Sequence, residues 1–139
     1  MAEQDIAMMA HLMRRAGFGA TREELEARAA TGYEATVEEL LNLDGPEPLD
    51  RNEMMRYHPW NWRPGTLPGM GAAEWLHDMI NTKRPLEQKM TLFWHQVFAT
   101  GVSKVDHYDD VMDMIFMFRE KGIGNFRELL LEVAKDPAM

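Results

Sequence analysis

The sequence predicts an all-α protein, an irregular bundle of about seven helices. Two observations support this fold class. Apolar residues recur every three or four positions in most segments, and no segment alternates polar and apolar residues over a strand's length. The 139 residues, 45% of them hydrophobic, suffice for one globular core. We therefore expect residues 1–139 to form a single all-α region.

The most strongly patterned stretch, residues 85–100, predicts the central helix of the core. Pro85 suits a first helical position, and Gly101 suits the end. One face carries an apolar stripe that we expect to be buried: Leu86, Met90, Phe93 and Val97. A second, weaker packing face lies opposite: Gln88, Leu92, His95 and Ala99.

Similar patterns predict the other helices. They cover about 5–16, 21–30, 33–41, 72–81, 108–121 and 125–135. Thr21 and Glu24 form a capping box, and Asn125 is an N-cap. Leu76 and Ile80 are among the apolar residues expected to be buried in the helix over 72–81.

Residues 42–70 predict a long loop, because prolines and glycines interrupt every helical pattern there. Its aromatic residues have two interpretations. Trp60, Trp62 and Arg63 could stack on a ligand such as a sugar or a peptide. The interpretation that we favour is a loop held on the core by its own tryptophans, since burying them is the larger energetic gain.

Composition limits the range of partners and locations. The formal net charge is −8 and the basic residues are scattered along the sequence, which argues against nucleic acid or an anionic membrane as a partner. The longest near-continuous apolar run, residues 111–118, is too short to span a bilayer. The acidic N-terminus lacks the basic start of a signal peptide, so we expect a cytoplasmic location.

The helix over 108–121 is apolar on nearly all sides, which predicts burial on all sides. Asp136 and Pro137 form a typical helix start at the very end of the sequence. We therefore expect a missing C-terminal region of the same protein, or a second copy contacting the Met- and Phe-rich helix 108–121. Thirteen methionines suit such an adaptable interface.

Three stretches resemble motifs of the large bacterial family known as domain of unknown function 1800. They are residues 11–20, residues 85–100 with their Trp94-His95 pair, and residues 124–130 followed by Asp136-Pro-Ala-Met139. The resemblance implies no established activity. It also implies a longer protein, because members continue past the last motif, and many members appear to be exported. Many members have a second histidine where this sequence has Val97, so a two-histidine metal site is not expected.

Three residues are candidates for chemistry. His95 could be a catalytic or metal-binding group completed by another part of the protein, although a histidine hydrogen-bonded between helices is the simpler interpretation. Glu74 and His77 have the Glu-x-x-His spacing of di-iron bundles, but such a site needs two of these motifs and further carboxylates. We therefore predict no metal and name no cofactor.

Two classes of function follow. The first is a helical scaffold or interaction region of a larger protein. The second is the N-terminal half of an enzyme or metal-binding protein whose site is completed by a C-terminal part. The sequence contains no cysteine, no Gly-rich phosphate loop and no nucleophile elbow. It therefore leaves open whether the protein is an enzyme.

Overall fold

The computed structural model describes residues 3–44, 69–105 and 107–139. These residues form seven α-helices and no strand, which confirms the all-α prediction. The helices are α1 Glu3–Ala16, α2 Arg22–Thr31, α3 Tyr33–Leu41, α5 Gly69–Asn81, α6 Pro85–Val97, α7 Tyr108–Lys121 and α8 Phe126–Val133. None of them is both long and apolar enough to cross a membrane. Most of the loop expected over 42–70 lies outside the described residues.

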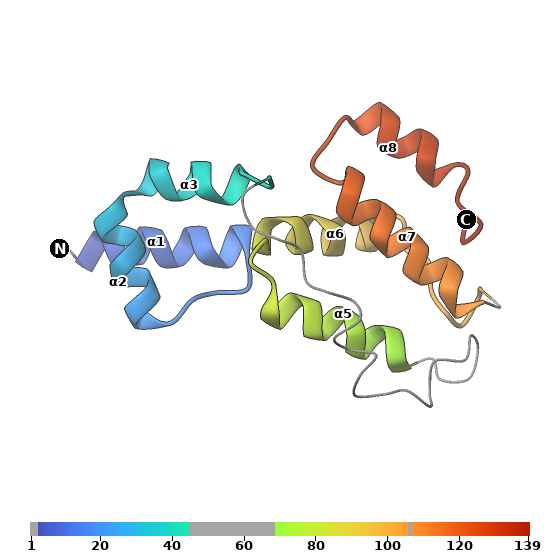
Figure 1. Cartoon of the computed structure of the whole chain (residues 1–139), viewed down its shortest axis with the longest axis horizontal. Coiled ribbons are helices and arrows are strands. Elements are labelled where there is room, and N and C mark those ends of the chain that lie inside the picture. The colour runs from blue at the N-terminus through green and yellow to red at the C-terminus, as the bar shows by residue number, and fades with distance from the viewer. Residues whose placement is uncertain (1–2, 45–68, 106) are drawn as a thin grey trace.

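The helices form two groups that lie end to end (Figure 1). The first group consists of α1, α2 and α3, around a core of Met9, Leu12, Met13 and Leu40. The second consists of α5 to α8, with two buried clusters that both draw on α7. One cluster contains Met114, Phe118, Leu129, Val133 and Ala138, and the other contains Val111, Met112 and Ile115.

Helix α6 joins the two groups, as expected of the central helix, because it contacts α1, α3, α5 and α7. At its start, an added Cβ on Gly17 would lie 3.0 Å from Pro85 Cβ, so only glycine lets the end of α1 approach this closely. Near its end, Trp94 Nε1 donates a hydrogen bond of 2.7 Å to the carbonyl of Gly122. The motif around residues 11–20 thus meets α6 through Gly17, and the motif at 124–130 meets it through Phe126, whose ring stacks on Trp94.

Local signals for helix ends are realised as hydrogen bonds. The hydroxyl of Thr21 accepts from the Glu24 N–H, and the side chain of Asn125 accepts from the N–H groups of Arg127 and Glu128. At Gly32, a φ of 107° allows α2 to end and α3 to begin at once, a conformation that favours glycine. These short-range predictions held because each depends on residues only a few positions apart.

The predicted orientation of α6 is wrong. Phe93 and Val97 of the expected core stripe are 48% and 52% exposed, whereas Glu87, Gln88 and Thr91 are buried. The most buried side chains of α6 are thus polar, and Trp94 beside them packs against the cluster around Phe118. The apolar stripe of Leu86, Met90, Phe93 and Val97 faces away from this buried centre, and we call it the α6 stripe.

Helix α7 finds neighbours for most of its apolar side chains within the chain, and contact with a partner stays a prediction. Five of its apolar side chains are buried: Val111, Met112, Met114, Ile115 and Phe118. Neighbours from α5, α6, α8 and the segment before α7 pack around them, including Trp75, Phe98 and Val105. These five side chains are therefore buried within the chain, whereas Asp113 and Glu120 of α7 are exposed. The exposed large apolar side chains of the described residues lie outside α7.

Large apolar residues are exposed on several other helices, including Leu76 and Ile80, which the sequence pattern predicted to be buried. On α3, Tyr33 and Leu41 are 44% and 50% exposed. On α5, Leu76 and Ile80 are 57% and 79% exposed, and on α8 Phe126 and Leu130 are 55% and 40% exposed. The helical period was right in each case, but the stripes are wider than the faces that the neighbouring helices cover.

Candidate functional site

Helices α5, α6 and α7 each carry buried or largely buried polar side chains, and we call this group of side chains the polar seam. It contains Glu74 and Asp78 of α5, Gln88 and Thr91 of α6, and Arg119 of α7. Arg119 Nη2 lies 2.8 Å from Asp78 Oδ2, and both side chains are largely buried. The contact is a close ion pair, although its N–H is not aligned for a hydrogen bond. Charge pairing across the seam therefore ties α5 to α7.

His95, the leading sequence candidate, lies in this seam at its α6 side. Its ring meets the ring of Trp75 edge-on, with centroids 5.1 Å apart and planes at 84°. Burial lowers the pKa of His95 below its usual value, which favours the neutral imidazole. Its Nδ1 is buried without a hydrogen-bond partner, as are Trp75 Nε1 and Gln88 Oε1. The seam therefore holds unused hydrogen-bonding capacity.

The metal candidates are not brought together as a complete ligand set. Glu74 and His77 lie on α5 and His95 lies on α6, and the described residues contain no group of three potential metal ligands. His77 Nδ1 instead lies 3.7 Å from Asp78 Oδ1. Trp60, Trp62 and Arg63, the predicted ligand-stacking residues, lie outside the described residues.

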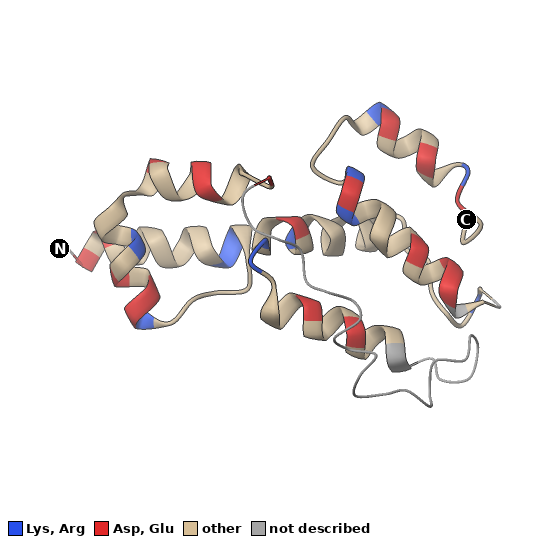
Figure 2. Cartoon of the chain, viewed as in Figure 1, with Lys and Arg blue, Asp and Glu red and all other residues tan. Residues whose placement is uncertain are grey.

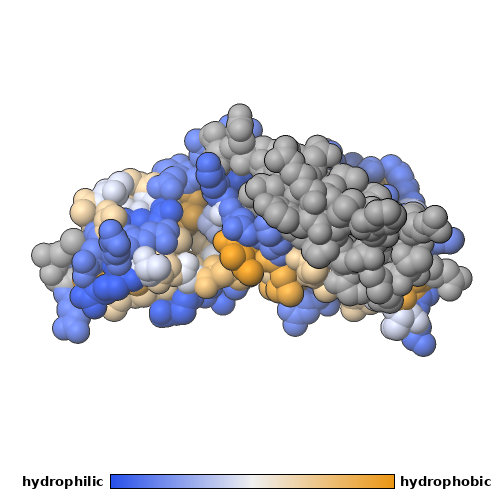
Figure 3. Space-filling view, turned by 60° about the horizontal axis from the view of Figure 1, so that its bottom comes forward, coloured by the Kyte–Doolittle hydropathy of each residue, from blue (hydrophilic) through white to orange (hydrophobic). Residues whose placement is uncertain are grey.

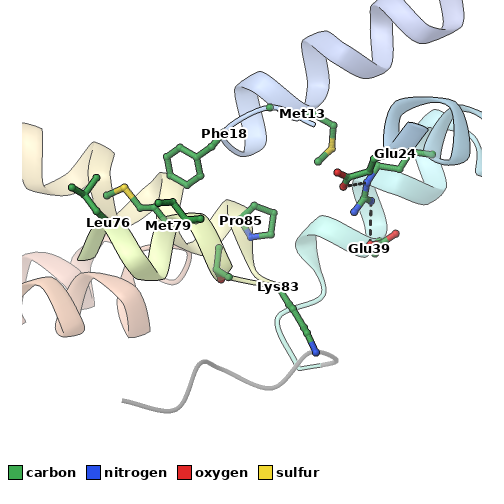
Figure 4. Close-up of a pocket in the computed structure, with 12 residues that line it drawn as sticks. Met13, Phe18, Glu24, Glu39, Leu76, Met79, Lys83 and Pro85 are labelled. Carbon is green, nitrogen blue, oxygen red and sulfur yellow. Dashed lines mark hydrogen bonds and ion pairs between the residues drawn. The ribbon is translucent and has the colours of Figure 1, made fainter. Parts of the chain in front are cut away.

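A second feature is an open groove of about 800 Å³ where the two helix groups meet, which we call the junction groove. Its apolar lining comes from both groups and consists of Met13, Phe18, Leu76, Met79, Ile80 and Pro85. Figure 4 shows Leu76, Met79 and Phe18 close together on one side, next to Pro85. Its volume is within the usual range of ligand pockets, roughly 300–1,000 Å³.

The opposite side of the junction groove is ionic. The guanidinium of Arg28 binds the carboxylates of Glu24 and Glu39, each at 3.1 Å (Figure 4). Burial, the largest single influence, lowers the pKa of Arg28, but the two carboxylates together raise it above its usual value. Arg28 is thus fully engaged by its neighbours and serves to hold α2 against α3.

A third feature is a row of aromatic rings that leads from the α6 stripe to α8. The Trp94 ring is 4.9 Å from Phe93 and 5.6 Å from Phe126, measured between centroids. Val97 and Leu130 each follow an exposed ring by one helical turn. We call these residues the aromatic patch: Phe93, Trp94, Val97, Phe126 and Leu130.

Sequence reasoning missed both apolar surfaces as sites. Phe18 is flanked by two glycines, which is a signal that could have indicated an unusual loop, and its ring is 45% exposed. Leu76 and Ile80 are one turn apart on α5, but that spacing also predicts an ordinary buried face. Only the packing of the two helix groups shows whether Leu76 and Ile80 form a buried face or an exposed surface.

These features define a class of protein: an all-α protein with exposed apolar surfaces and a buried polar seam around one central helix. A family model with the description "Protein of unknown function (DUF1800)" matches residues 11–139, so the chain belongs to this family. A search of the curated proteins and a search of the solved structures each found no match. The family membership confirms the resemblance carried by the three motifs and assigns no activity.

Proposed function

We propose that this protein is a helical interaction region, in which the α6 stripe and the aromatic patch bind an apolar helix of another polypeptide segment. One observation supports this most strongly. Helix α6 buries Glu87, Gln88 and Thr91 while Phe93 and Val97 remain about half exposed. Because burial of apolar area is the main favourable term in association, an exposed stripe of this kind favours a binding surface.

The spacing of the α6 stripe favours a helix as the bound element. Its residues recur every three or four positions and form a ridge of the kind that packs into the groove of a facing helix. In our proposal that helix belongs to a further region of the same protein. An interaction with a second copy of this chain is the competing possibility. Binding within one longer polypeptide would not depend on protein concentration, whereas dimerisation would.

Light scattering of the purified chain tests this proposal. With its natural partner absent, the wild-type chain should bind a hydrophobic dye and gain average mass as concentration rises, because exposed apolar side chains associate. The double substitution Phe93→Ser and Phe126→Ser should remove most of both effects. Tyr33→Ser is the matched control, since Tyr33 is a similarly exposed aromatic on α3, and this variant should behave as the wild type does. A wild-type chain that stays monomeric and ignores the dye would contradict the proposal.

The polar seam supports a second candidate function, in which a segment outside the described residues completes a catalytic or metal site at His95. The supporting observation is the buried, unpartnered Nδ1 of His95 beside Trp75. Metal analysis of the protein purified from its own cells tests this idea. Stoichiometric metal that is lost on His95→Ala would favour it, and metal-free protein would remove its metal-binding form. We also propose a cytoplasmic location, which cell fractionation would test.

A further inference from the structure

The junction groove has an apolar wall that nothing in the described part of the chain covers. Ile80 is 79% exposed, Leu76 is 57% exposed and Phe18 is 45% exposed. Figure 3 shows hydrophobic surface near the middle of the face that it presents. The three side chains come from α5 and from the loop after α1, so a ligand that covers them would bridge both helix groups.

Two lysines lie near this wall, although the whole chain carries a net charge of −8. Lys83 lines the groove, and Lys89 Nζ lies 5.1 Å from the centroid of the Phe18 ring. Within the described residues neither lysine forms an ion pair with a carboxylate, in contrast to Arg28. Figure 2 shows further basic residues at this junction, where the end of α1, with Arg14 and Arg15 in its last turn, approaches the start of α6.

We propose that the junction groove binds an acidic amphipathic helix of a partner polypeptide. The apolar face of that helix covers Phe18, Leu76 and Ile80, and carboxylates on its flanks meet Lys83 and Lys89. This is the helix-in-groove mode of recognition, in which a few apolar anchors supply affinity and flanking charges supply orientation. This site is separate from the aromatic patch, so the inference does not depend on the proposed function.

Charge complementarity is the reason for choosing this partner. The groove offers apolar area together with two cations that have no carboxylate of their own. A basic amphipathic helix would place like charges side by side, which opposes binding. A second copy of the chain could offer only its own acidic helices, such as α8 with exposed Leu130 and Leu131, and a fatty acid would use only one cation. The experiment distinguishes each of these.

The test measures binding of two synthetic helical peptides to the full chain by fluorescence anisotropy at low salt. Both peptides are about 15 residues long and carry leucines on one face. One has glutamates beside that face and the other has lysines at the same positions. The wild-type chain should bind the glutamate peptide about tenfold more tightly, because each exposed charge pair contributes modestly. Ile80→Asp should weaken binding of the glutamate peptide at least about tenfold.

Charge reversal supplies the decisive comparison. The double substitution Lys83→Glu and Lys89→Glu should reverse the preference, so that the lysine peptide binds better. Lys104→Glu with Lys121→Glu changes the net charge equally, away from the groove, and should retain the wild-type preference. Leu131→Asp is the matched control for Ile80→Asp, because Leu131 is 50% exposed on α8. Circular dichroism of every variant shows whether the helices remain folded.

Several outcomes would overturn the proposal. One is equal affinity of the wild-type chain for the two peptides, and another is a preference that survives charge reversal at Lys83 and Lys89. Saturable binding of laurate without binding of either peptide would identify a lipid carboxylate as the ligand instead. Dimerisation that is lost on Ile80→Asp would identify a second copy. The Phe93→Ser, Phe126→Ser variant should bind the glutamate peptide as the wild type does, which separates this site from the proposed function.

Discussion

Single residues set the close approaches around α6, and Gly122 is the sharpest case. A Cβ added there would lie 2.8 Å from Trp94 Cδ1 and would clash with the carbonyl oxygen of Phe118. Gly122→Ala should therefore displace the indole ring and lower the free energy of unfolding by about 1–3 kcal/mol. Urea denaturation followed by circular dichroism measures this loss. Gly101→Ala is the control, because its added Cβ would meet only Ser103 Oγ at 3.9 Å. Equal stability of the two variants would contradict the packing at Trp94.

The titration of His95 gives a second prediction at this scale. Burial lowers its pKa in the folded state, so the unfolded chain binds more protons as the pH falls below about 6.5. His95 should therefore lower the stability of the fold on acidification from about pH 6.5 down to its depressed folded-state pKa. His95→Gln, which does not titrate, should show a smaller fall of the melting temperature between pH 7 and pH 5. An identical fall in the two proteins would show that this ring is not buried.

At the scale of helices, a buried phenylalanine on α7 and an exposed one on α6 should differ in how much their loss destabilises the fold. Phe118 of α7 is fully buried, so Phe118→Ala should cost about 3–5 kcal/mol of unfolding free energy. Phe93 of α6 is 48% exposed, so Phe93→Ala should cost clearly less, about 1–2 kcal/mol. Chemical denaturation of both variants measures the difference. A loss at Phe93 as large as at Phe118 would restore the core position that the sequence pattern predicted.

The ion pair between Asp78 and Arg119 ties α5 to α7, and its burial decides its importance. Asp78→Asn leaves Arg119 buried without its counter-charge, which should cost about 3–5 kcal/mol of unfolding free energy. Glu26→Gln is the matched control. It breaks the exposed Arg22–Glu26 pair of α2, where solvent screening leaves a loss of about 0.5 kcal/mol or less. Thermal melts of the two variants that coincide would mean that the seam is open to water.

The helices themselves were predictable from the sequence, but their orientations were not. Caps at Thr21 and Asn125 and the start at Pro85 depend on neighbours a few residues away, and all three are present. The buried face of α6 depends on how other helices pack against it, including α7, which lies well beyond α6 in the sequence. A stripe of apolar residues indicates a face that prefers burial, and it does not say which polypeptide buries it.

Of the candidate sites, likewise, one could be recognised from nearby residues and the other depends on the packing of distant segments. His95 was recognisable from the sequence because its residue type carries chemistry, and the structure adds its buried Nδ1 and its contact with Trp75. The junction groove was not recognisable, since it requires Phe18 from the loop after α1 to meet α5, about 60 residues later. No local pattern reports the distance between such segments.

At the scale of the whole molecule, two helix groups share α6 (Figure 1). The residues of the α6 stripe belong to none of the buried clusters. The sequence contains no cysteine, so a single introduced cysteine can be labelled without background. Its reactivity toward a maleimide reports whether a position is covered. Val97→Cys places the thiol on the stripe, and Ala35→Cys places it at an exposed position on α3 as a control.

The most direct test compares the labelling rate of Val97→Cys in living cells with that of the dilute purified chain, each divided by the rate at Ala35→Cys. The proposal predicts that the purified chain reacts quickly at both positions, and that Val97→Cys reacts at least about tenfold more slowly in cells, because a partner helix covers the stripe. Equal relative rates in cells and in the purified chain would show that the α6 stripe is open where the protein works, and would contradict its role as a binding surface.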